Sequence, residues 1–130
     1  HNPVTWDING GLVFDEQAKE ELFEELKKDY VSGVTFSGGD PFHLENREEI
    51  GALAKEIREK FPDKTIWLYT GYEWEEICHL SFLSNIDVIV DGKFKIEEKD
   101  NNLHWKGSAN QRVIDVKASL RAGEVRLYQE

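Results

Sequence analysis

The chain has 130 residues, the usual size of one domain, and 39% of them are apolar, which is enough to bury a core. Its 26 acidic residues outnumber the 16 basic ones and give a formal net charge of −10. Binding to nucleic acid or to a polyanionic membrane surface is therefore disfavoured, because neutralising phosphates requires clustered Lys and Arg.

A single cysteine, Cys78, excludes an intrachain disulfide framework and is typical of a reducing cytoplasm. No apolar run approaches membrane-spanning length, and no hydrophobic signal peptide is present in these residues. We expect a cytoplasmic protein without a membrane partner. Because the chain starts at His1 and contains no methionine, we also expect it to be part of a longer product.

The first two thirds of the chain alternate between helical and strand patterns. The helical segments repeat apolar residues at intervals of three and four, whereas the strand segments are short and largely apolar. Helices are expected at 16–29, 47–61 and 72–80, and strands at 34–37, 65–70 and 87–90. This order predicts βαβ units and a parallel sheet within one domain covering residues 1–130.

The last third of the chain has a different pattern. Residues 103–106 resemble a short strand. Residues 113–116 and 124–128 alternate between apolar and polar side chains on either side of Arg121-Ala122-Gly123. This pattern predicts a C-terminal β-hairpin or a pair of edge strands.

Three glycine-containing turns follow the carboxyl ends of predicted strands: Gly38-Gly39-Asp40, Thr70-Gly71-Tyr72 and Asp91-Gly92-Lys93. In a parallel sheet or a partial barrel these turns lie on one rim, where ligands usually bind. Glycine lets the backbone approach a ligand closely because it has no Cβ. Ordinary turn chemistry, which also favours Gly, Asp and Pro, is the alternative reading of each turn.

Five blocks of sequence, taken in order, are similar to a known family. They are His1-Asn2-Pro3-Val4-Thr5-Trp6, Ser37-Gly38-Gly39-Asp40-Pro41, the stretch 67–72, the stretch 90–94 and the stretch 105–112. The series resembles the activating proteins of anaerobic ribonucleoside-triphosphate reductase, which are radical S-adenosylmethionine enzymes. The resemblance extends from His1 to Arg112, and the last 18 residues carry no recognisable family mark.

The resemblance implies a partial β/α barrel of the radical S-adenosylmethionine type whose first strand and cluster loop are absent from this chain. It implies a 4Fe–4S cluster that reductively cleaves S-adenosylmethionine, and a 5′-deoxyadenosyl radical that leaves a glycyl radical on the large subunit of the reductase. An electron donor such as flavodoxin or ferredoxin would supply the electron that reduces the cluster.

Site residues follow from the same resemblance. The Gly-Gly-Asp-Pro motif contacts the methionyl end of the cofactor in the family, and the residues after the last cluster cysteine lie beside it. The cofactor-binding residues implied here are His1, Asn2, Gly38, Gly39, Asp40, Pro41, Thr70, Asp91 and Lys93. Ser108, Asn110, Gln111 and Arg112 are expected to close the site or to contact the reductase.

The family holds its cluster with Cys-x-x-x-Cys-x-x-Cys, which would end immediately before His1, and none of these cysteines is present. Without thiolate ligands the chain as given is expected to be inactive as a radical enzyme. We expect the cysteine segment in a longer product.

Two alternatives stay open: activation of another glycyl-radical enzyme such as pyruvate formate-lyase, and a cluster-free module that binds a small molecule or a partner. Cys78 is expected to be a buried core thiol.

Overall fold

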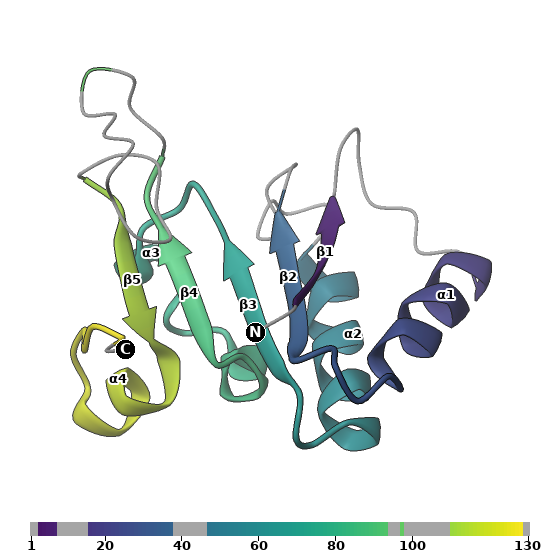
Figure 1. Cartoon of the computed structure of the whole chain (residues 1–130). Coiled ribbons are helices and arrows are strands. Elements are labelled where there is room, and N and C mark those ends of the chain that lie inside the picture. Colours follow the sequence, from purple (N-terminus) through teal and green to yellow (C-terminus); the bar gives the residue numbers. More distant parts are fainter. Residues whose placement is uncertain (1–2, 8–15, 38–46, 94–96, 98–109, 129–130) are drawn as a thin grey trace.

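Five strands form one sheet in the computed structural model, and their order in space follows their order in the chain (Figure 1). The structure describes residues 3–7, 16–37, 47–93, 97 and 110–128. The strands are β1 (Pro3–Asp7), β2 (Gly33–Ser37), β3 (Thr65–Tyr69), β4 (Val88–Asp91) and β5 (Arg112–Asp115). The helices are α1 (Glu16–Leu26), α2 (Arg47–Lys60), α3 (Trp74–Ile77), the 3₁₀ helix η1 (Ser81–Asn85) and α4 (Val116–Ala122).

Strands β1 to β4 are mutually parallel, and β5 closes the series antiparallel to β4. The register places Phe36, Leu68, Ile89 and Ile114 in one row across the sheet. All four side chains are fully buried. An open α/β sheet of mostly parallel strands, as in a partial barrel, is the fold class that the helix and strand patterns predict.

The helices cover one face of this sheet. Alternate residues of each strand point to opposite faces, so the row containing Leu68 shares its face with Ile66. These residues form one apolar cluster with buried residues of the helices, among them Leu26 of α1, Ile57 of α2 and Ile77 of α3. These three helices therefore bury their apolar stripes against the same side of the sheet, and this packing stabilises the arrangement of the strands.

The opposite face carries Trp67, Val88 and Val90, which are buried without belonging to that cluster. Tyr128 covers Trp67 in an edge-to-face contact, with ring centroids 5.2 Å apart. The C-terminal segment therefore covers part of the sheet face that the helices leave open.

Several boundaries differ from those that the patterns predict. The helix expected at 72–80 is divided into α3 and η1, and helix α1 ends at Leu26 instead of residue 29. The strand β1 is an element that the patterns did not predict, and its pairing with β2 defines it. Residues 103–106 lie outside the described residues.

The C-terminal region contains a helix where a tight turn is expected. Asp115 caps α4, its carboxylate accepting a hydrogen bond from the Ala118 amide at 3.0 Å. Gly123 ends the helix in the left-handed conformation, with φ of 72°. Strand β5 is an edge strand of the main sheet, and Leu127 forms an antiparallel bridge with Ile114. Strand β5 is thus the one edge strand formed among the described residues of this region, whereas residues 124–128 make only an isolated bridge, and α4 lies between them in place of a hairpin turn.

In the part of the chain that the structure describes, none of the helices has the length and apolar character needed to span a bilayer.

Candidate functional site

The turns that follow β3 and β4 lie side by side at the carboxyl edge of the sheet (Figure 1). The Thr70 amide donates to the Val90 carbonyl at 3.0 Å, and the Gly92 amide donates to the Tyr72 carbonyl at 2.9 Å. The rim that strand order predicts is therefore continuous across these two turns. The third turn, Gly38 to Pro41, lies outside the described residues, and so does Ser108.

His1 and Asn2 also lie outside the described residues. The residue that follows them, Pro3, pairs with Gly33 at the amino end of β2. That end of the sheet is opposite to the rim at Thr70 and Asp91. Contact of His1 and Asn2 with the cofactor stays a prediction.

Thr70 and Lys93 occupy different environments on the rim. Thr70 is buried, and its Oγ1 accepts a hydrogen bond from the Tyr72 amide at 3.1 Å, which shapes the turn after β3. Lys93 is exposed just beyond the end of β4. The turn after β3 thus carries a buried hydroxyl, and the turn after β4 carries an exposed ammonium group that can act as a cationic donor.

Asp91 is the most buried charged residue of the rim, with 1% of its surface exposed. Its Oδ1 accepts hydrogen bonds from the backbone amide and the Nε of Arg112, at 3.2 and 3.1 Å. Its Oδ2 accepts from Arg112 Nη2 at 2.5 Å and from the Trp74 amide at 2.8 Å. Both oxygens of the carboxylate are thus used within the chain.

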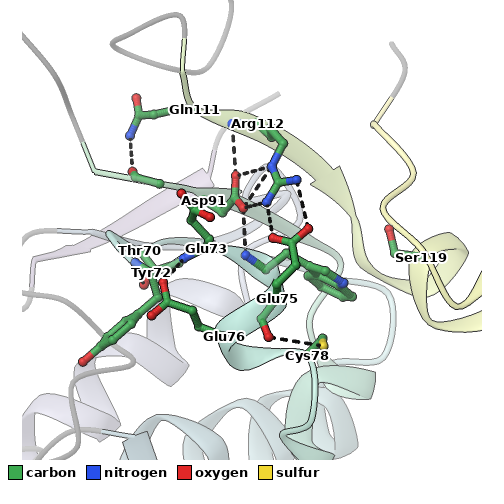
Figure 2. Close-up of polar contacts among 12 residues, drawn as sticks. Thr70, Tyr72, Glu73, Glu75, Glu76, Cys78, Asp91, Gln111, Arg112 and Ser119 are labelled. Atoms are coloured by element: carbon green, nitrogen blue, oxygen red, sulfur yellow. Dashed lines mark hydrogen bonds and ion pairs between the residues drawn. The ribbon is translucent and has the colours of Figure 1, made fainter.

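Arg112 bridges two carboxylates, as Figure 2 shows. Besides Asp91, its guanidinium donates to Glu75 through Nη1 at 3.3 Å and Nη2 at 2.8 Å. Hydrogen bonds to Asp91, and then to Glu75, raise the pKa of Arg112 above its usual range. The hydrogen bond from Arg112 lowers the pKa of the exposed Glu75. The bridge joins the end of β4, the start of α3 and the start of β5.

The residues before Arg112 continue this contact. Gln111 Nε2 donates to the Gly92 carbonyl at 2.9 Å, and Asn110 Nδ2 donates to the Lys93 carbonyl at 2.8 Å. The structure therefore brings Asn110, Gln111 and Arg112 to the rim. Glu75 was not among the expected site residues, and one of three acidic residues within 73–76 carries no sequence signal for this role.

Cys78 lies at the end of α3 and is exposed, so the expectation of a buried core thiol is wrong. The buried residues of α3 are Trp74 and Ile77. The next position along the helix is rotated away from the core. Among the described residues there is no group of three or more His, Cys, Asp or Glu arranged to hold a metal ion.

A 4Fe–4S cluster needs several thiolate ligands. The chain has one cysteine, and it lies on α3 beside Glu75, whose carbonyl oxygen is 3.9 Å from the sulfur. These residues therefore do not supply a ligand set for such a cluster.

Comparison with known proteins assigns the chain to a family. Residues 1–114 match the profile of the 4Fe-4S single cluster domain. The chain is 42% identical over 113 residues to the anaerobic ribonucleoside-triphosphate reductase-activating protein of Enterobacteria phage T4, which covers 87% of this chain and 72% of that relative. The proteins of the same name from Haemophilus influenzae and Escherichia coli K12 are each 37% identical over 117 residues, covering 87% of this chain and 76% of theirs. No solved structure matches the chain.

The fold and these matches define a 4Fe–4S domain of the radical S-adenosylmethionine class. Within that class, the chain belongs to the family of anaerobic ribonucleoside-triphosphate reductase-activating proteins.

Proposed function

We propose that this protein activates an anaerobic ribonucleoside-triphosphate reductase, binding S-adenosylmethionine at the carboxyl rim of its sheet. The observation that carries the proposal is the 42% identity over 113 residues to a relative that bears that function in its name. The activation consists of installing a glycyl radical on the large subunit of the reductase, which is the proposed protein partner.

The chemistry of the rim fits the methionyl end of this cofactor. A zwitterion needs acceptors for its ammonium group and donors for its carboxylate. The exposed Lys93 provides a cationic donor, and the buried Thr70 lies on the adjacent turn. The proposed cofactor surface comprises His1, Asn2, Gly38, Gly39, Asp40, Pro41, Thr70 and Lys93, with Asp91 buried beneath it. Asn110, Gln111 and Arg112 hold the turn after β4 in place through their hydrogen bonds to residues 91–93.

The reaction class also requires a 4Fe–4S cluster and a one-electron donor, for which we propose a flavodoxin or a ferredoxin. Low-potential donors of this kind work in the reducing cytoplasm, which is the proposed location. The thiolate ligands of the cluster are not provided by the residues of this chain, so the roles proposed for its side chains are limited to binding and orienting S-adenosylmethionine.

The test uses the protein as its gene encodes it, reconstituted anaerobically with iron and sulfide. We expect iron incorporation, binding of S-adenosylmethionine, release of 5′-deoxyadenosine on reduction, and a glycyl radical signal in the large subunit by electron paramagnetic resonance. Retained iron without any cleavage of the cofactor would contradict the proposal.

A matched pair of lysine variants tests the rim itself. Lys93→Ala removes the exposed cation next to β4, whereas Lys55→Ala removes an exposed cation from α2, away from the rim. We expect weaker binding of S-adenosylmethionine in the first variant and unchanged binding in the second. Equal affinities would place the cofactor elsewhere on the molecule.

A cluster-free binding module is the second candidate, and the single cysteine favours it. It predicts that the protein encoded by the gene binds S-adenosylmethionine or the large subunit of the reductase with no iron after any reconstitution. Iron incorporation in the first experiment would exclude it.

A further inference from the structure

The connection between β4 and β5 is fastened at its base by three consecutive side chains. Arg112 donates to the Asp91 carboxylate. Gln111 donates to the carbonyl of Gly92, and Asn110 donates to the carbonyl of Lys93. These contacts extend the antiparallel pairing of β4 and β5, in which Asp91 lies opposite Arg112. Beyond the ends of β4 and β5, hydrogen bonds from side chains to the backbone thus take the place of the backbone hydrogen bonds between the two strands.

The backbone at Gly92 is held from both sides. Its amide donates to the Tyr72 carbonyl at 2.9 Å, and its carbonyl accepts from Gln111 at 2.9 Å. Gly92 has a φ of 89°, a conformation that other residues rarely adopt. The direction in which the chain leaves β4 toward Lys93 is therefore fixed by hydrogen bonds and by the choice of glycine.

Asp91 has little capacity left for an external ligand. A carboxylate offers about four lone-pair positions, and this one accepts hydrogen bonds from three groups of Arg112 and from the Trp74 amide. The side chain is almost completely buried. Withdrawing Arg112 would leave an uncompensated buried charge, which is strongly unfavourable. The geometry therefore favours a fixed pair over an exchange of partners.

We infer that Asp91 and Arg112 are positioning residues of the S-adenosylmethionine site, holding the Gly92–Lys93 backbone and the start of α3 in the geometry that receives the cofactor. Neither side chain contacts the cofactor. The inference deepens the proposed function and rests on it. It assigns the Asn-Gln-Arg triplet to the architecture of the cofactor rim and leaves contact with the reductase to other surfaces.

Glu75 has a lesser role in this arrangement. Its exposed carboxylate accepts from Nη1 and Nη2 of the guanidinium. The buried Asp91 accepts from Nε and Nη2 and forms the inner contact (Figure 2). Exposed ion pairs contribute little to geometry or stability. The inner contact is therefore the one that should determine cofactor affinity.

The experiment measures the affinity of the reconstituted full-length protein for S-adenosylmethionine by equilibrium dialysis without reductant, so that no turnover occurs. The single variants are Arg112→Gln, Arg112→Lys, Asp91→Asn and Glu75→Gln. The double variant Asp91→Asn/Arg112→Gln leaves no buried charge and is used if the single Arg112→Gln variant does not fold. Arg126→Gln is the matched control, because Arg126 pairs with the exposed Glu124 at 2.7 Å.

We expect Arg112→Gln to weaken binding about tenfold or more, since small displacements of binding groups have large effects. Arg112→Lys should retain part of the affinity that Arg112→Gln loses, and Glu75→Gln should weaken binding less than Arg112→Gln does. The control Arg126→Gln should leave the affinity within about twofold of the wild type. Amide hydrogen exchange should accelerate at Gly92 and Trp74 in Arg112→Gln and stay unchanged in β2.

Three results would overturn the inference. Unchanged affinity in Arg112→Gln and in the double variant, with lowered thermal stability, would make the pair structural only. Loss of binding in Asp91→Asn with normal binding in Arg112→Gln would make Asp91 a direct ligand. Absence of binding in the wild-type protein would remove the proposed cofactor site as well, and so identifies failure of the proposed function separately.

Discussion

Replacing Arg58 with alanine should destabilise the fold far more than removing a neighbouring exposed charge from the same helix. Arg58 lies on α2, and its side chain is 20% exposed. Nη1 donates to the carbonyls of Pro62 and Lys64 at 3.3 and 3.1 Å. Nη2 donates to the Asn85 carbonyl at 2.9 Å and to Asp87 Oδ2 at 2.5 Å. One side chain thus joins α2, the turn before β3 and the turn before β4.

The magnitude follows from these contacts. Hydrogen bonds to a charged group contribute about 1.5–3 kcal/mol each, and breaking a buried ion pair costs about 3–5 kcal/mol. Asp87 is itself 20% exposed and keeps the Ile66 amide at 2.8 Å and Lys117 at 3.4 Å, which reduces the loss. The Nε of Arg58 is buried without a hydrogen-bond partner in the described structure, and alanine removes that penalty. We therefore expect a loss of about 3 kcal/mol.

The assay is urea denaturation of the wild type, Arg58→Ala and the control Lys60→Ala. Lys60 lies on the same helix, is 55% exposed and is 3.8 Å from Glu56. Its removal should cost less than about 1 kcal/mol. Free energies of unfolding within about 0.5 kcal/mol of each other for the two variants would refute the reasoning, because the convergent contacts of Arg58 would then carry no net stability.

Three further predictions concern single residues. Gly33→Ala should lower the free energy of unfolding by about 2 kcal/mol or more in urea denaturation, because a Cβ there would overlap the Thr65 carbonyl, and wild-type stability would contradict the clash. Cys78 is exposed, so a thiol reagent should titrate one equivalent in the native protein at the rate seen in denaturant, whereas strong protection would contradict its placement. The pKa of Glu75 is lowered by its hydrogen bond from Arg112, so its contribution to stability is present at neutral pH and is lost as pH falls through that lowered pKa. The stability difference between wild type and Glu75→Gln should accordingly shrink as the pH falls through that lowered pKa, and a difference independent of pH would refute it.

The parallel sheet was predictable because each of its parts carries a local signal. The helix α2 repeats apolar residues along one face and stops before Pro62. The strand β3 is apolar and its central residues are buried. Once helices and strands alternate, the chain has few options besides parallel pairing, so the neighbouring positions of Thr70 and Asp91 on one rim follow from strand order.

The C-terminal helix α4 was missed for a physical reason. The residues Val113 to Val116 alternate as in a strand, but Val116 is the first residue of the helix and is buried in the core. Asp115 and Gly123 are ordinary signals for the start and end of a helix. A short alternating run is compatible with either structure, so tertiary packing decides between them.

The contact between Asp91 and Arg112 joins residues 21 positions apart. It exists because β5 pairs with β4 in one register, and no periodicity within either segment reports that register. The sequence therefore indicates that both residues matter at the rim but not that they bond each other. The exposure of Cys78 could not be predicted from the sequence either, because it depends on which side of the four-residue helix α3 faces the core.

The strands are arranged in the sheet in the same order as in the chain, and this has a consequence for synthesis on the ribosome. Each strand from β2 onward pairs with the strand made just before it, so the sheet can grow at one edge as the chain emerges. The edge at β5 stays open until residues 127 and 128 are made, when the Tyr128 amide bonds the Val113 carbonyl and Leu127 pairs with Ile114. A nascent chain stalled before this point presents unpaired backbone groups of β5 to neighbouring chains on the same messenger RNA, and the pairing of Leu127 and Tyr128 protects this edge from aggregation with other copies.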